Sequence, residues 1–440
     1  RHQEKRISID RSCHPLLPSL RVPSAMGCAN SNPANKAQPA SASQPASGSK
    51  VEVYGVTGSM NCMSVILLAG DNNILDLKVT MPRTDTTKEE FLKINPFGAV
   101  PAIKDGDVNL AESSTILRYL AQKYAVAAYP ADTKTRAHID WACDRFSSSM
   151  YADAYATIYP VIGYSSPPDD AQAAAKKCMD NLTEFCNKFL TTKFVGGDEP
   201  SIADYKVAPF FFCYEHGSLL AKSGVTCPDR IKSFNKDFSA KSKSYNMLIE
   251  AQGYAVKELL EARSDVKSDM LTGEGFKALE GSAPTLPKDV KTEGKVEVHG
   301  VPVSFNAVGC IMLAKEANCG EMKQCMPGQD TMKEEFLKIN PFHGIPAVKD
   351  GDYCVAESSV ILRYLAEAYW PSAYPADDLK KRAFIDWSID RFASAMYSPD
   401  AYTCLYPILG FAGHPADQKA AGQACTERLG EFCEGFLKKK

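Results

Sequence analysis

The 440-residue sequence predicts an α/β unit followed by an all-helical bundle, with this pair of units present twice in one chain. Three observations support the prediction. The stretch KEEFLKINPFGAVPAIKDGDVNLAESSTILRYL at 88–120 returns in closely similar form at 333–365, with matching residues 245 positions apart. Strand and helix patterns follow one another in the order βαβαββα up to the end of each stretch. The residues beyond have a helical period, and a gap-free repeat of this length indicates a duplicated domain.

The first α/β unit is expected at 51–125. VEVYGV alternates apolar and polar residues as a strand does, and Gly58-Ser59 then breaks the pattern before a helical stretch. The expected elements are a strand at 51–56, a helix at 60–69, a strand at 74–79, a short helix ending at 92, hairpin strands at 102–104 and 108–110, and a helix at 112–124. This order describes a small mixed sheet with helices and does not by itself give a function.

The helical bundle of the first copy is expected at 126–264. Ser201 and Asp204 form a capping box, which predicts the start of the apolar helix 205–214. The segment 265–294 is charged, contains Gly and Pro, and is predicted to be a linker. The second copy is expected as an α/β unit at 295–370 and a helical unit at 371–440. Lys440 corresponds to Lys193, so we expect a truncated second bundle without a counterpart of the helix 205–214.

Composition indicates an ordinary globular protein. The sequence is 45% hydrophobic and 23% charged, and its net charge of −3 gives no basic field for nucleic acid. The fifteen cysteines form no CxxC pair and no zinc-type cluster, which favours reduced thiols, a cytoplasmic location and no metal. No apolar run approaches the roughly 18 residues that a membrane-spanning helix needs.

The first 50 residues are expected to form a disordered leader, rich in Ala, Ser, Pro and Gln towards its end. Within it, MGCANS at 26–31 fits the myristoylation pattern, and Cys28 could add a palmitoyl chain. Myristoylation of Gly27 would associate the protein with a membrane, provided that Gly27 becomes N-terminal. The alternative is a chance match.

Two stretches give the first copy a family resemblance. INPFGAVPAIKDGD…ESSTILRYL resembles the glutathione-site region of the theta and phi classes of cytosolic glutathione S-transferases. VYGVTGSMNCMSVILLA resembles the first strand, catalytic serine and first helix of the theta and delta classes. The resemblance covers about Val51–Glu261 and again Val296–Lys440, as a tandem duplication. It implies a thioredoxin-like βαβαββα domain followed by a helical bundle in each copy.

The resemblance implies that Pro101 and Pro346 follow cis peptide bonds. The backbone of Ala99 and Val100 would then pair with the cysteinyl backbone of glutathione, like an added strand. Gly344 and Ile345 would do the same in the second copy. The alternative is an ordinary trans proline at the start of a strand.

Glu112-Ser113 and Glu357-Ser358 each open the helix that follows the hairpin. A helix N-terminus with a hydroxyl and free N–H groups can bind a carboxylate. The resemblance assigns this carboxylate to the γ-glutamyl residue of glutathione, whose ammonium group would meet the glutamate. A simple N-capping role is the alternative.

The resemblance makes Ser59 the catalytic residue, with Ser304 as its counterpart. A hydroxyl at this entry to the first helix can donate a hydrogen bond to the glutathione sulfur, next to the positive helix end. The serine would stabilise the thiolate and would not itself be the nucleophile. The alternative is a serine that only caps the helix.

Two departures from the family pattern leave alternatives open. Asn61-Cys62-Met63 stands where related sequences often have Pro-Cys-Arg, and Cys62 is either an activated thiol for thiol transfer or a small packed residue. In the second copy Val303 replaces Gly58, which would tilt Ser304.

The first helical unit carries a tyrosine every four residues, at Tyr151, Tyr155 and Tyr159. These tyrosines form either a wall for an apolar substrate or a core or interface stripe. The pairs Asp144-Arg145 and Asp390-Arg391 are expected to be structural.

We therefore expect a tandem glutathione transferase that conjugates glutathione to small apolar electrophiles or reduces organic hydroperoxides, with glutathione as cosubstrate. The first copy is expected to be active. The copies would pair within one chain as a pseudo-dimer, or the chain would form a homodimer. A non-catalytic binding or docking module of the same fold is one alternative, and a thiol oxidoreductase that uses Cys62 is another.

Overall fold

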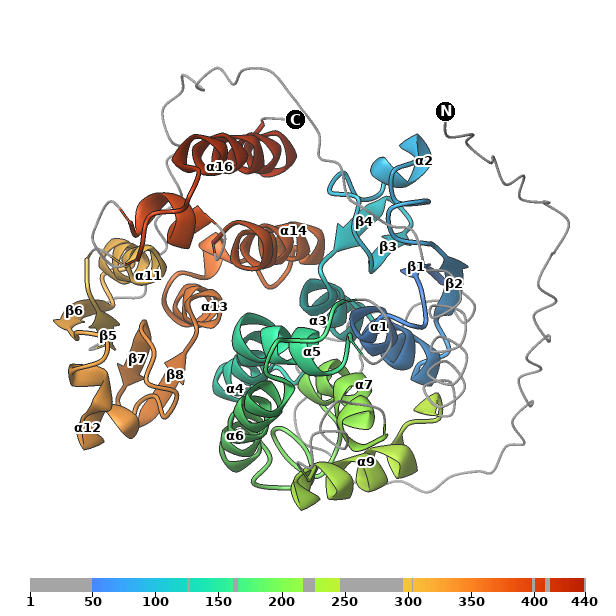
Figure 1. Ribbon diagram of the computed structural model, residues 1–440, viewed down its shortest axis with the longest axis horizontal. Coiled ribbons are helices and arrows are strands. Elements are labelled where there is room, and N and C mark those ends of the chain that lie inside the picture. The colour runs from blue at the N-terminus through green and yellow to red at the C-terminus, as the bar shows by residue number, and fades with distance from the viewer. Residues whose placement is uncertain are drawn as a thin grey trace, which may run out of the picture. The chain divides into compact units, whose positions relative to one another are not determined.

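The protein is represented by a computed structural model that describes residues 50–124, 127–160, 165–216, 226–245, 296–302, 304–397, 400–407 and 412–438 (Figure 1). The predicted leader up to residue 49, with its motif at 26–31, lies outside the described residues, as do Val303 and the predicted linker 265–294. We call 50–245 copy 1 and 296–438 copy 2. The described residues fall within one compact unit.

Copy 1 opens with a mixed four-stranded sheet in the order β2-β1-β3-β4. Strand β1 pairs in parallel with β2 and antiparallel with β3, which forms a hairpin with β4. The predicted order βαβαββα is confirmed. The elements are β1 Val51–Gly55, α1 Met60–Asp71, β2 Leu75–Val79, α2 Glu89–Leu92, β3 Ala102–Asp105, β4 Val108–Ala111 and α3 Ser113–Lys123.

The alternating pattern of β1 determines which of its residues enter the core. Val51 and Val53 are fully buried, whereas Glu52 and Tyr54 are partly exposed on the opposite face. Helices α1 and α3 pack against each other, and their apolar residues join the same core as Val51 and Val53. Tyr54 meets Phe91 of α2 on the other face, with ring centroids 6.0 Å apart. The sheet is therefore covered on both faces.

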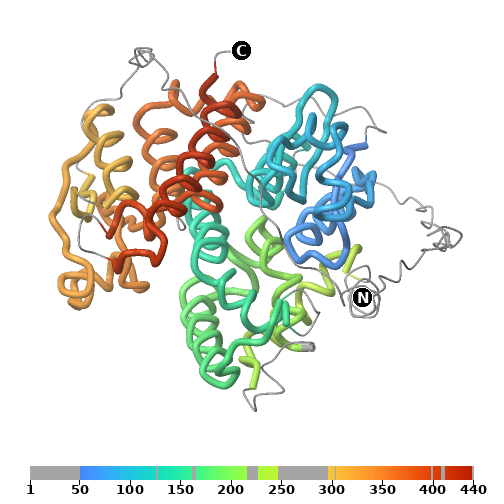
Figure 2. Tube along the Cα trace, turned by 45° about the horizontal axis from the view of Figure 1, so that its top comes forward, coloured from blue at the N-terminus to red at the C-terminus, as the bar shows by residue number. Residues whose placement is uncertain are grey.

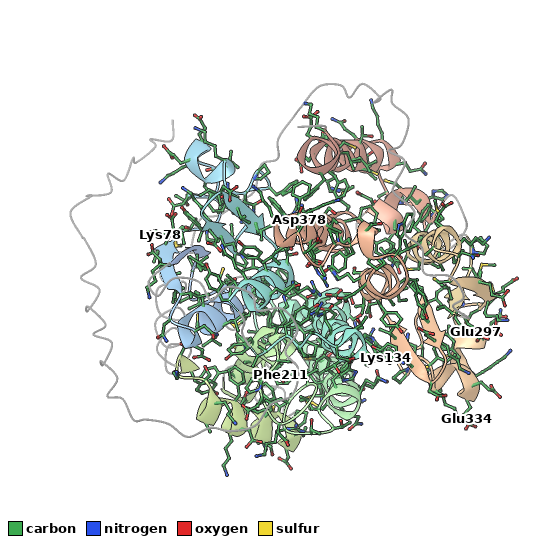
Figure 3. The ribbon with its side chains drawn as sticks, turned by 180° about the vertical axis from the view of Figure 1, so that it is seen from behind. Lys78, Lys134, Phe211, Glu297, Glu334 and Asp378 are labelled. Carbon is green, nitrogen blue, oxygen red and sulfur yellow. The ribbon has the colours of Figure 1, made fainter. Side chains whose placement is uncertain are left out.

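The rest of copy 1 is helical, as predicted. Its elements are α4 Thr133–Arg145, the π-helical turn η1 Phe146–Met150, α5 Tyr151–Thr157, α6 Ala171–Phe189, α7 Ile202–His216 and α9 Asp229–Lys241. Phenylalanines dominate the core of this bundle, and Phe211 is among the fully buried ones (Figure 3). Helix α7 packs against α1, α3 and α4, so it joins the helical bundle to the α/β unit.

Copy 2 repeats the sheet in the order β6-β5-β7-β8. Its α/β elements are β5 Val296–Gly300, α11 Phe305–Glu316, β6 Gly320–Gln324, η2 Asp330–Met332, α12 Glu334–Leu337, β7 Ala347–Asp350, β8 Tyr353–Ala356 and α13 Ser358–Tyr369. The helical elements are η3 Pro371–Ala373, α14 Leu379–Arg391, η4 Phe392–Tyr397, η5 Ala401–Leu405, α16 Gln418–Phe432 and η6 Cys433–Leu437. Asp378 caps α14 by accepting a hydrogen bond of 2.9 Å from the Lys381 N–H (Figure 3).

The two copies meet through α3 and α4 of copy 1 and α14 and α13 of copy 2 (Figures 1 and 2). Arg118 is fully buried between them and binds Asp140 and Asp144 of its own copy and Asp390 of the other. Arg363 makes the matching set of bonds, to Asp386 and Asp390 of its own copy and to Asp144 of the other. At the edge of this contact, Lys134 lies 5.5 Å from the Tyr353 ring (Figure 3).

Candidate functional site

Ser59 occupies the turn between β1 and α1. Its backbone is extended, with φ −93° and ψ 120°, which makes it the N-cap of the 12-residue helix α1. Its Oγ accepts a long hydrogen bond of 3.4 Å from the Cys62 N–H, and the side chain is only half-buried. The hydroxyl therefore lies at the positive end of α1 and keeps capacity for a further partner.

Cys62 is buried beneath this turn. Burial raises the pKa of its thiol to about 11. A Cβ added at Gly55 would lie 2.8 Å from the Cys62 sulfur, so the side chain fills the space between β1 and α1. In this structure Cys62 has the environment of a packed residue and lacks the exposure and lowered pKa of a reactive thiol.

Both X-Pro peptide bonds ahead of the third strands, Val100–Pro101 and Ile345–Pro346, are cis. An asparagine holds each preceding loop, since the Asn95 side-chain amide donates to the Ala99 carbonyl at 2.7 Å and Asn340 does the same to Gly344 at 2.8 Å. Among the described residues, the N–H and C=O of Val100 have no hydrogen-bond partner. The backbone just ahead of β3, an inner strand of the sheet, can therefore pair with another extended chain.

Glu112 lies at the start of α3 with a positive φ of 65°, and its side chain makes no capping hydrogen bond. Its counterpart Glu357 has a φ of 69° and likewise leaves its helix uncapped. Burial raises the pKa of Glu112 to about 6, although the charge of Arg391 opposes this shift. The glutamates are thus not conventional N-caps, and their carboxylates face other groups.

The groups next to these glutamates come from the opposite copy. Arg391 of copy 2 lies 3.7 Å from the Glu112 carboxylate, and Arg145 of copy 1 lies 3.8 Å from that of Glu357. Ser148 also donates to Glu357 at 3.2 Å. From the sequence, Arg145 and Arg391 were expected to be structural. Their contact with the predicted site residues crosses between copies, so no local pattern could reveal it.

The three tyrosines of the predicted stripe separate into two kinds. The hydroxyls of Tyr151 and Tyr159 are 3.2 Å apart in a partly buried pair, while Tyr155 is 48% exposed. Burial raises the pKa of Tyr151, the hydrogen bond with Tyr159 opposes this shift, and the nearby Glu112 carboxylate adds to it. Tyr151 therefore lies within electrostatic reach of the Ser59 turn and of Glu112.

Ser304, the counterpart of Ser59, caps α11 with an extended backbone but makes no side-chain capping bond. It is buried, whereas Ser59 is half-exposed. The two serines therefore differ in their access to solvent.

A further polar residue of copy 1, not predicted from the sequence, lies next to Ser113. Lys206 of α7 donates to the Ser113 hydroxyl at 2.6 Å and to the side-chain oxygen of Asn61 at 2.9 Å. The signal was a single lysine within the otherwise apolar run YKVAPFFF. Ser59, Glu112, Ser113 and Lys206 thus surround the facing ends of α1 and α3.

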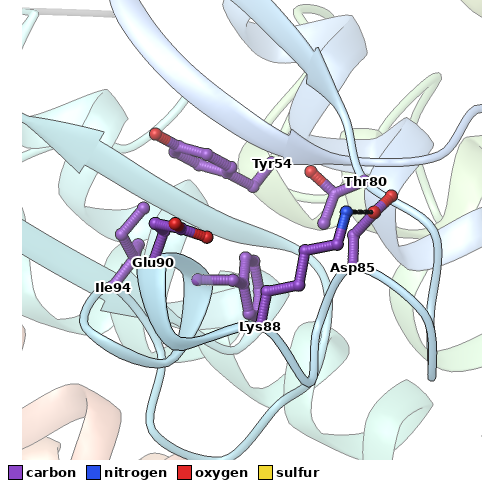
Figure 4. A pocket seen from close by; sticks show the side chains of 7 residues that line it. Tyr54, Thr80, Asp85, Lys88, Glu90 and Ile94 are labelled. Carbon is purple, nitrogen blue, oxygen red and sulfur yellow. Dashed lines mark hydrogen bonds and ion pairs between the residues drawn. The ribbon is translucent and has the colours of Figure 1, made fainter.

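A pocket of about 240 Å³ lies elsewhere on copy 1, between β1 and α2 (Figure 4). It is lined by Tyr54, Thr80, Asp85, Lys88, Glu90, Phe91 and Ile94. An ion pair of 2.7 Å between Lys88 and Asp85 borders it. None of the predicted site residues lines this pocket, and we do not assign it to the candidate site.

Within the described ranges, no group of three or more His, Cys, Asp or Glu side chains is arranged to hold a metal ion. No helix in the same part of the chain is long and apolar enough to cross a membrane.

Comparison with known proteins identifies the family. Residues 53–128 and 304–367 each match a family model described as the N-terminal domain of glutathione S-transferase. Mouse glutathione S-transferase theta-1 is 33% identical over 165 residues, which cover 35% of this chain and 69% of the relative. The chain belongs to the glutathione S-transferase family. It carries the N-terminal domain of that family twice, in tandem.

Other glutathione S-transferases show similar agreement. Form F11 of Arabidopsis thaliana is 32% identical over 169 residues, covering 36% of this chain and 79% of the relative. Among solved structures, poplar glutathione transferase F1 is 26% identical, with 47% of this chain and 100% of that chain covered and a TM-score of 0.40. A delta-class glutathione transferase from Nilaparvata lugens is also 26% identical, with 48% of this chain and 99% of that chain covered and a TM-score of 0.40. The two family-model matches and the order of the two four-stranded sheets give each copy the thioredoxin-like sheet of this family, followed by helices.

Proposed function

We propose that this glutathione S-transferase conjugates the glutathione thiolate to small apolar electrophiles, with Ser59 of copy 1 as the residue that stabilises the thiolate. The observation that carries the proposal is the Ser59 hydroxyl, which is half-exposed at the N-terminus of α1 and accepts a hydrogen bond of 3.4 Å from the Cys62 N–H. Reduction of organic hydroperoxides would begin from the same thiolate.

The free energy needed to lower the pKa of the glutathione thiol matches what the Ser59 turn can supply. A thiol with a pKa of about 8.5 must be lowered by about two units to be mostly ionised at neutral pH, which corresponds to about 2.7 kcal/mol. A hydrogen bond to a charged group contributes about 1.5–3 kcal/mol, and a helix N-terminus adds about 0.3–1 kcal/mol. The Ser59 hydroxyl and the α1 N-terminus together therefore reach the required magnitude.

Glutathione would be held at two further points of copy 1. The backbone groups of Val100, which find no partner within the described ranges, would pair with its cysteinyl residue next to Ala99. Ser113 and the N-terminus of α3 would bind its γ-glutamyl carboxylate, while Glu112 would bind the adjacent ammonium group. Gly344, Ile345, Glu357, Ser358 and Ser304 would serve the same purposes in copy 2, whose buried serine favours a weaker activity.

The electrophile would approach beside the tyrosine pair. Tyr151 lies within electrostatic reach of Glu112 and Cys62, and Tyr159 packs against it with ring centroids 6.0 Å apart. These two residues would form the apolar wall. Tyr155, which is largely exposed, would contribute at the rim.

We further propose that the two copies act as a pseudo-dimer within one chain, with functional units at 51–125, 126–264, 295–370 and 371–440. The buried cluster around Arg118 and Arg363 supports this arrangement, as do Arg391 and Arg145, which reach the glutamate of the opposite copy. Each glutathione site would then be composite.

Conjugation of glutathione to an aryl halide by the full chain tests the proposal. Because Ser59 would supply about 2 kcal/mol, Ser59→Ala is expected to lower kcat/KM about thirtyfold. Ser304→Ala and Cys62→Ala are expected to change it less than threefold. Full activity in the Ser59→Ala/Ser304→Ala double variant would refute the role of both serines, and loss of activity in Cys62→Ala with retained folding would favour thiol chemistry instead.

A further inference from the structure

Lys206 is a buried lysine beneath the predicted γ-glutamyl subsite of copy 1. It lies in the second turn of α7, and only 4% of its surface is exposed. Its ammonium group donates to Ser113 Oγ at 2.6 Å and to Asn61 Oδ1 at 2.9 Å. The lysine thus connects α7 to the first residue of α3 and to the first turn of α1.

The charge of Lys206 has no direct counterion. Among the residues that the structure describes, no carboxylate lies within ion-pair distance of its nitrogen, and its two acceptors are neutral. Glu112, Asp144 and Asp390 act on it only across longer distances, and burial lowers its pKa. A buried ammonium group without a paired anion is costly, and lysines are rarely buried unless paired. An anion bound at Ser113 would compensate this charge.

The hydrogen-bond directions around Ser113 favour such an anion. Since Lys206 donates to Ser113 Oγ, the hydroxyl proton of Ser113 remains available for an acceptor. In the structure this proton has only a long contact of 3.4 Å to Asn61 Oδ1. Ser113 is also the first residue of the 11-residue helix α3, whose N-terminus favours negative charge. A carboxylate at this point would meet the hydroxyl, the helix end and the nearby ammonium together.

We propose that Lys206 is a positioning residue of the copy 1 glutathione site, which directs the Ser113 hydroxyl towards the γ-glutamyl carboxylate and supplies its compensating charge. This inference rests on the proposed function. In copy 2, Asn306 and Ser358 occupy the positions that match Asn61 and Ser113, and no lysine of the described residues bonds to either side chain. The two sites therefore differ in charge at the same subsite.

Two ligands and two substitutions test the proposal in the full chain. The ligands are glutathione and 4-aminobutanoyl-cysteinylglycine, which lacks the γ-glutamyl carboxylate but keeps the ammonium group and the thiol. The variants are Lys206→Met and Ser113→Ala, alone and combined, with Lys206→Gln as a second variant that keeps a hydrogen-bond donor without the charge. Lys232→Met serves as the control, because Lys232 lies on α9 and pairs with the nearby Asp229. KM and kcat are measured for both ligands after circular dichroism has established folding.

Lys206→Met is expected to raise KM for glutathione about tenfold with kcat changed less than twofold, as loss of one charge-assisted contact predicts. KM for the analogue should change less than twofold. In the Ser113→Ala background, Lys206→Met should raise KM for glutathione by less than a further twofold, because the two residues act together. KM for glutathione in Lys206→Gln should lie between the values for wild type and Lys206→Met. If Lys206→Met does not fold, Lys206→Gln replaces it in every comparison.

An equal rise in KM for both ligands would overturn the proposal, since it would show a purely structural role. Additive effects in the double variant, or wild-type KM in both Lys206 variants, would overturn it as well. These results differ from a failure of the proposed function, in which the wild-type chain would neither conjugate nor bind glutathione.

Discussion

Ser59 and Cys62 are separated by three positions, and their surroundings assign them opposite properties. Ser59 is half-exposed at the helix N-terminus, while Cys62 is enclosed against Gly55 and has a pKa raised to about 11 by burial. The sequence placed both residues at the entry to the first helix but left the state of Cys62 open. The distance from Cys62 to Gly55 depends on how α1 packs on β1, which local sequence patterns do not determine.

Glu112 gives the site a predicted pH dependence. Burial raises its pKa from 4.5 to about 6, so the carboxylate that would bind the glutathione ammonium is lost as pH falls through about 6. Glutathione affinity is therefore expected to fall up to about tenfold per pH unit below this value. Calorimetric titration between pH 5 and 7 measures it. In Glu112→Gln the affinity should be low and flat over this range, while Glu357→Gln should keep the profile; an unchanged profile in Glu112→Gln would contradict the assignment.

The same shift affects folding stability with a definite sign. Because the folded pKa of Glu112 exceeds the unfolded value, its contribution favours folding fully below pH 4.5 and is lost as pH rises through about 6. Binding of the ligand ammonium thus requires the ionised form of Glu112, which burial in the folded protein disfavours.

At the scale of elements, the stability of α7 depends on the hydrogen bonds of Asp204 in its first turn. Asp204 accepts hydrogen bonds from the Ser201 backbone N–H and hydroxyl, both at 2.7 Å, and from the Val195 N–H at 3.0 Å. Asp204→Ala leaves these buried donors without an acceptor, so we expect it to lower the free energy of unfolding by about 2 kcal/mol. Urea denaturation of the full chain measures this loss.

Asp132→Ala is the matched control for this element. Asp132 caps α4 through the Thr135 N–H at 2.8 Å, but its side chain is exposed, so water can replace it. Its removal is expected to cost about 0.5–1 kcal/mol. A loss for Asp204→Ala no greater than for Asp132→Ala would show that the buried bonds do not support α7.

The elements themselves were largely predictable from the sequence. The βαβαββα order follows from the alternation in VEVYGV, the helical spacing of 60–69 and the turn at Asp105-Gly106-Asp107, all of which are local signals. The capping box predicted the helix α7, although the helix begins at Ile202, directly after Ser201, and not at residue 205 as predicted. Lys206 was not identified, because its partners Ser113 and Asn61 are far away in sequence and meet it only after α7 packs on α1 and α3.

At the scale of the whole molecule, the contact between copies has a buried ionic centre. Burial opposes ionisation of Asp390, but Arg363 and Arg118 outweigh this effect and lower its pKa. The sequence suggested that the copies pair, but Asp144 and Asp390 were assigned only a general structural role, and Arg118 and Arg363 were not identified. Their partners lie more than 200 positions away, so their pairing is a property of the folded chain.

This centre provides a stability prediction. Arg363→Met leaves Asp386, Asp390 and Asp144 with one fewer buried cation, and we expect a loss of about 3–5 kcal/mol in the free energy of unfolding. Lys380→Met breaks an exposed ion pair with Asp107 that also joins the copies, and it should lower the free energy of unfolding far less. Guanidinium denaturation compares the two variants. Equal, small losses would exclude a buried ionic contact between the copies.

If Ser59 of copy 1 stabilises a glutathione thiolate, as proposed, the pKa of the bound thiol must depend on its hydroxyl. Ultraviolet thiolate absorbance of glutathione bound to the full chain, titrated against pH, should give a pKa about two units below the free value of about 8.5. Ser59→Ala should return it most of the way to that value, while Ser304→Ala leaves it low. A wild-type thiol pKa near the free value, or a low pKa that persists in Ser59→Ala, would contradict the claim.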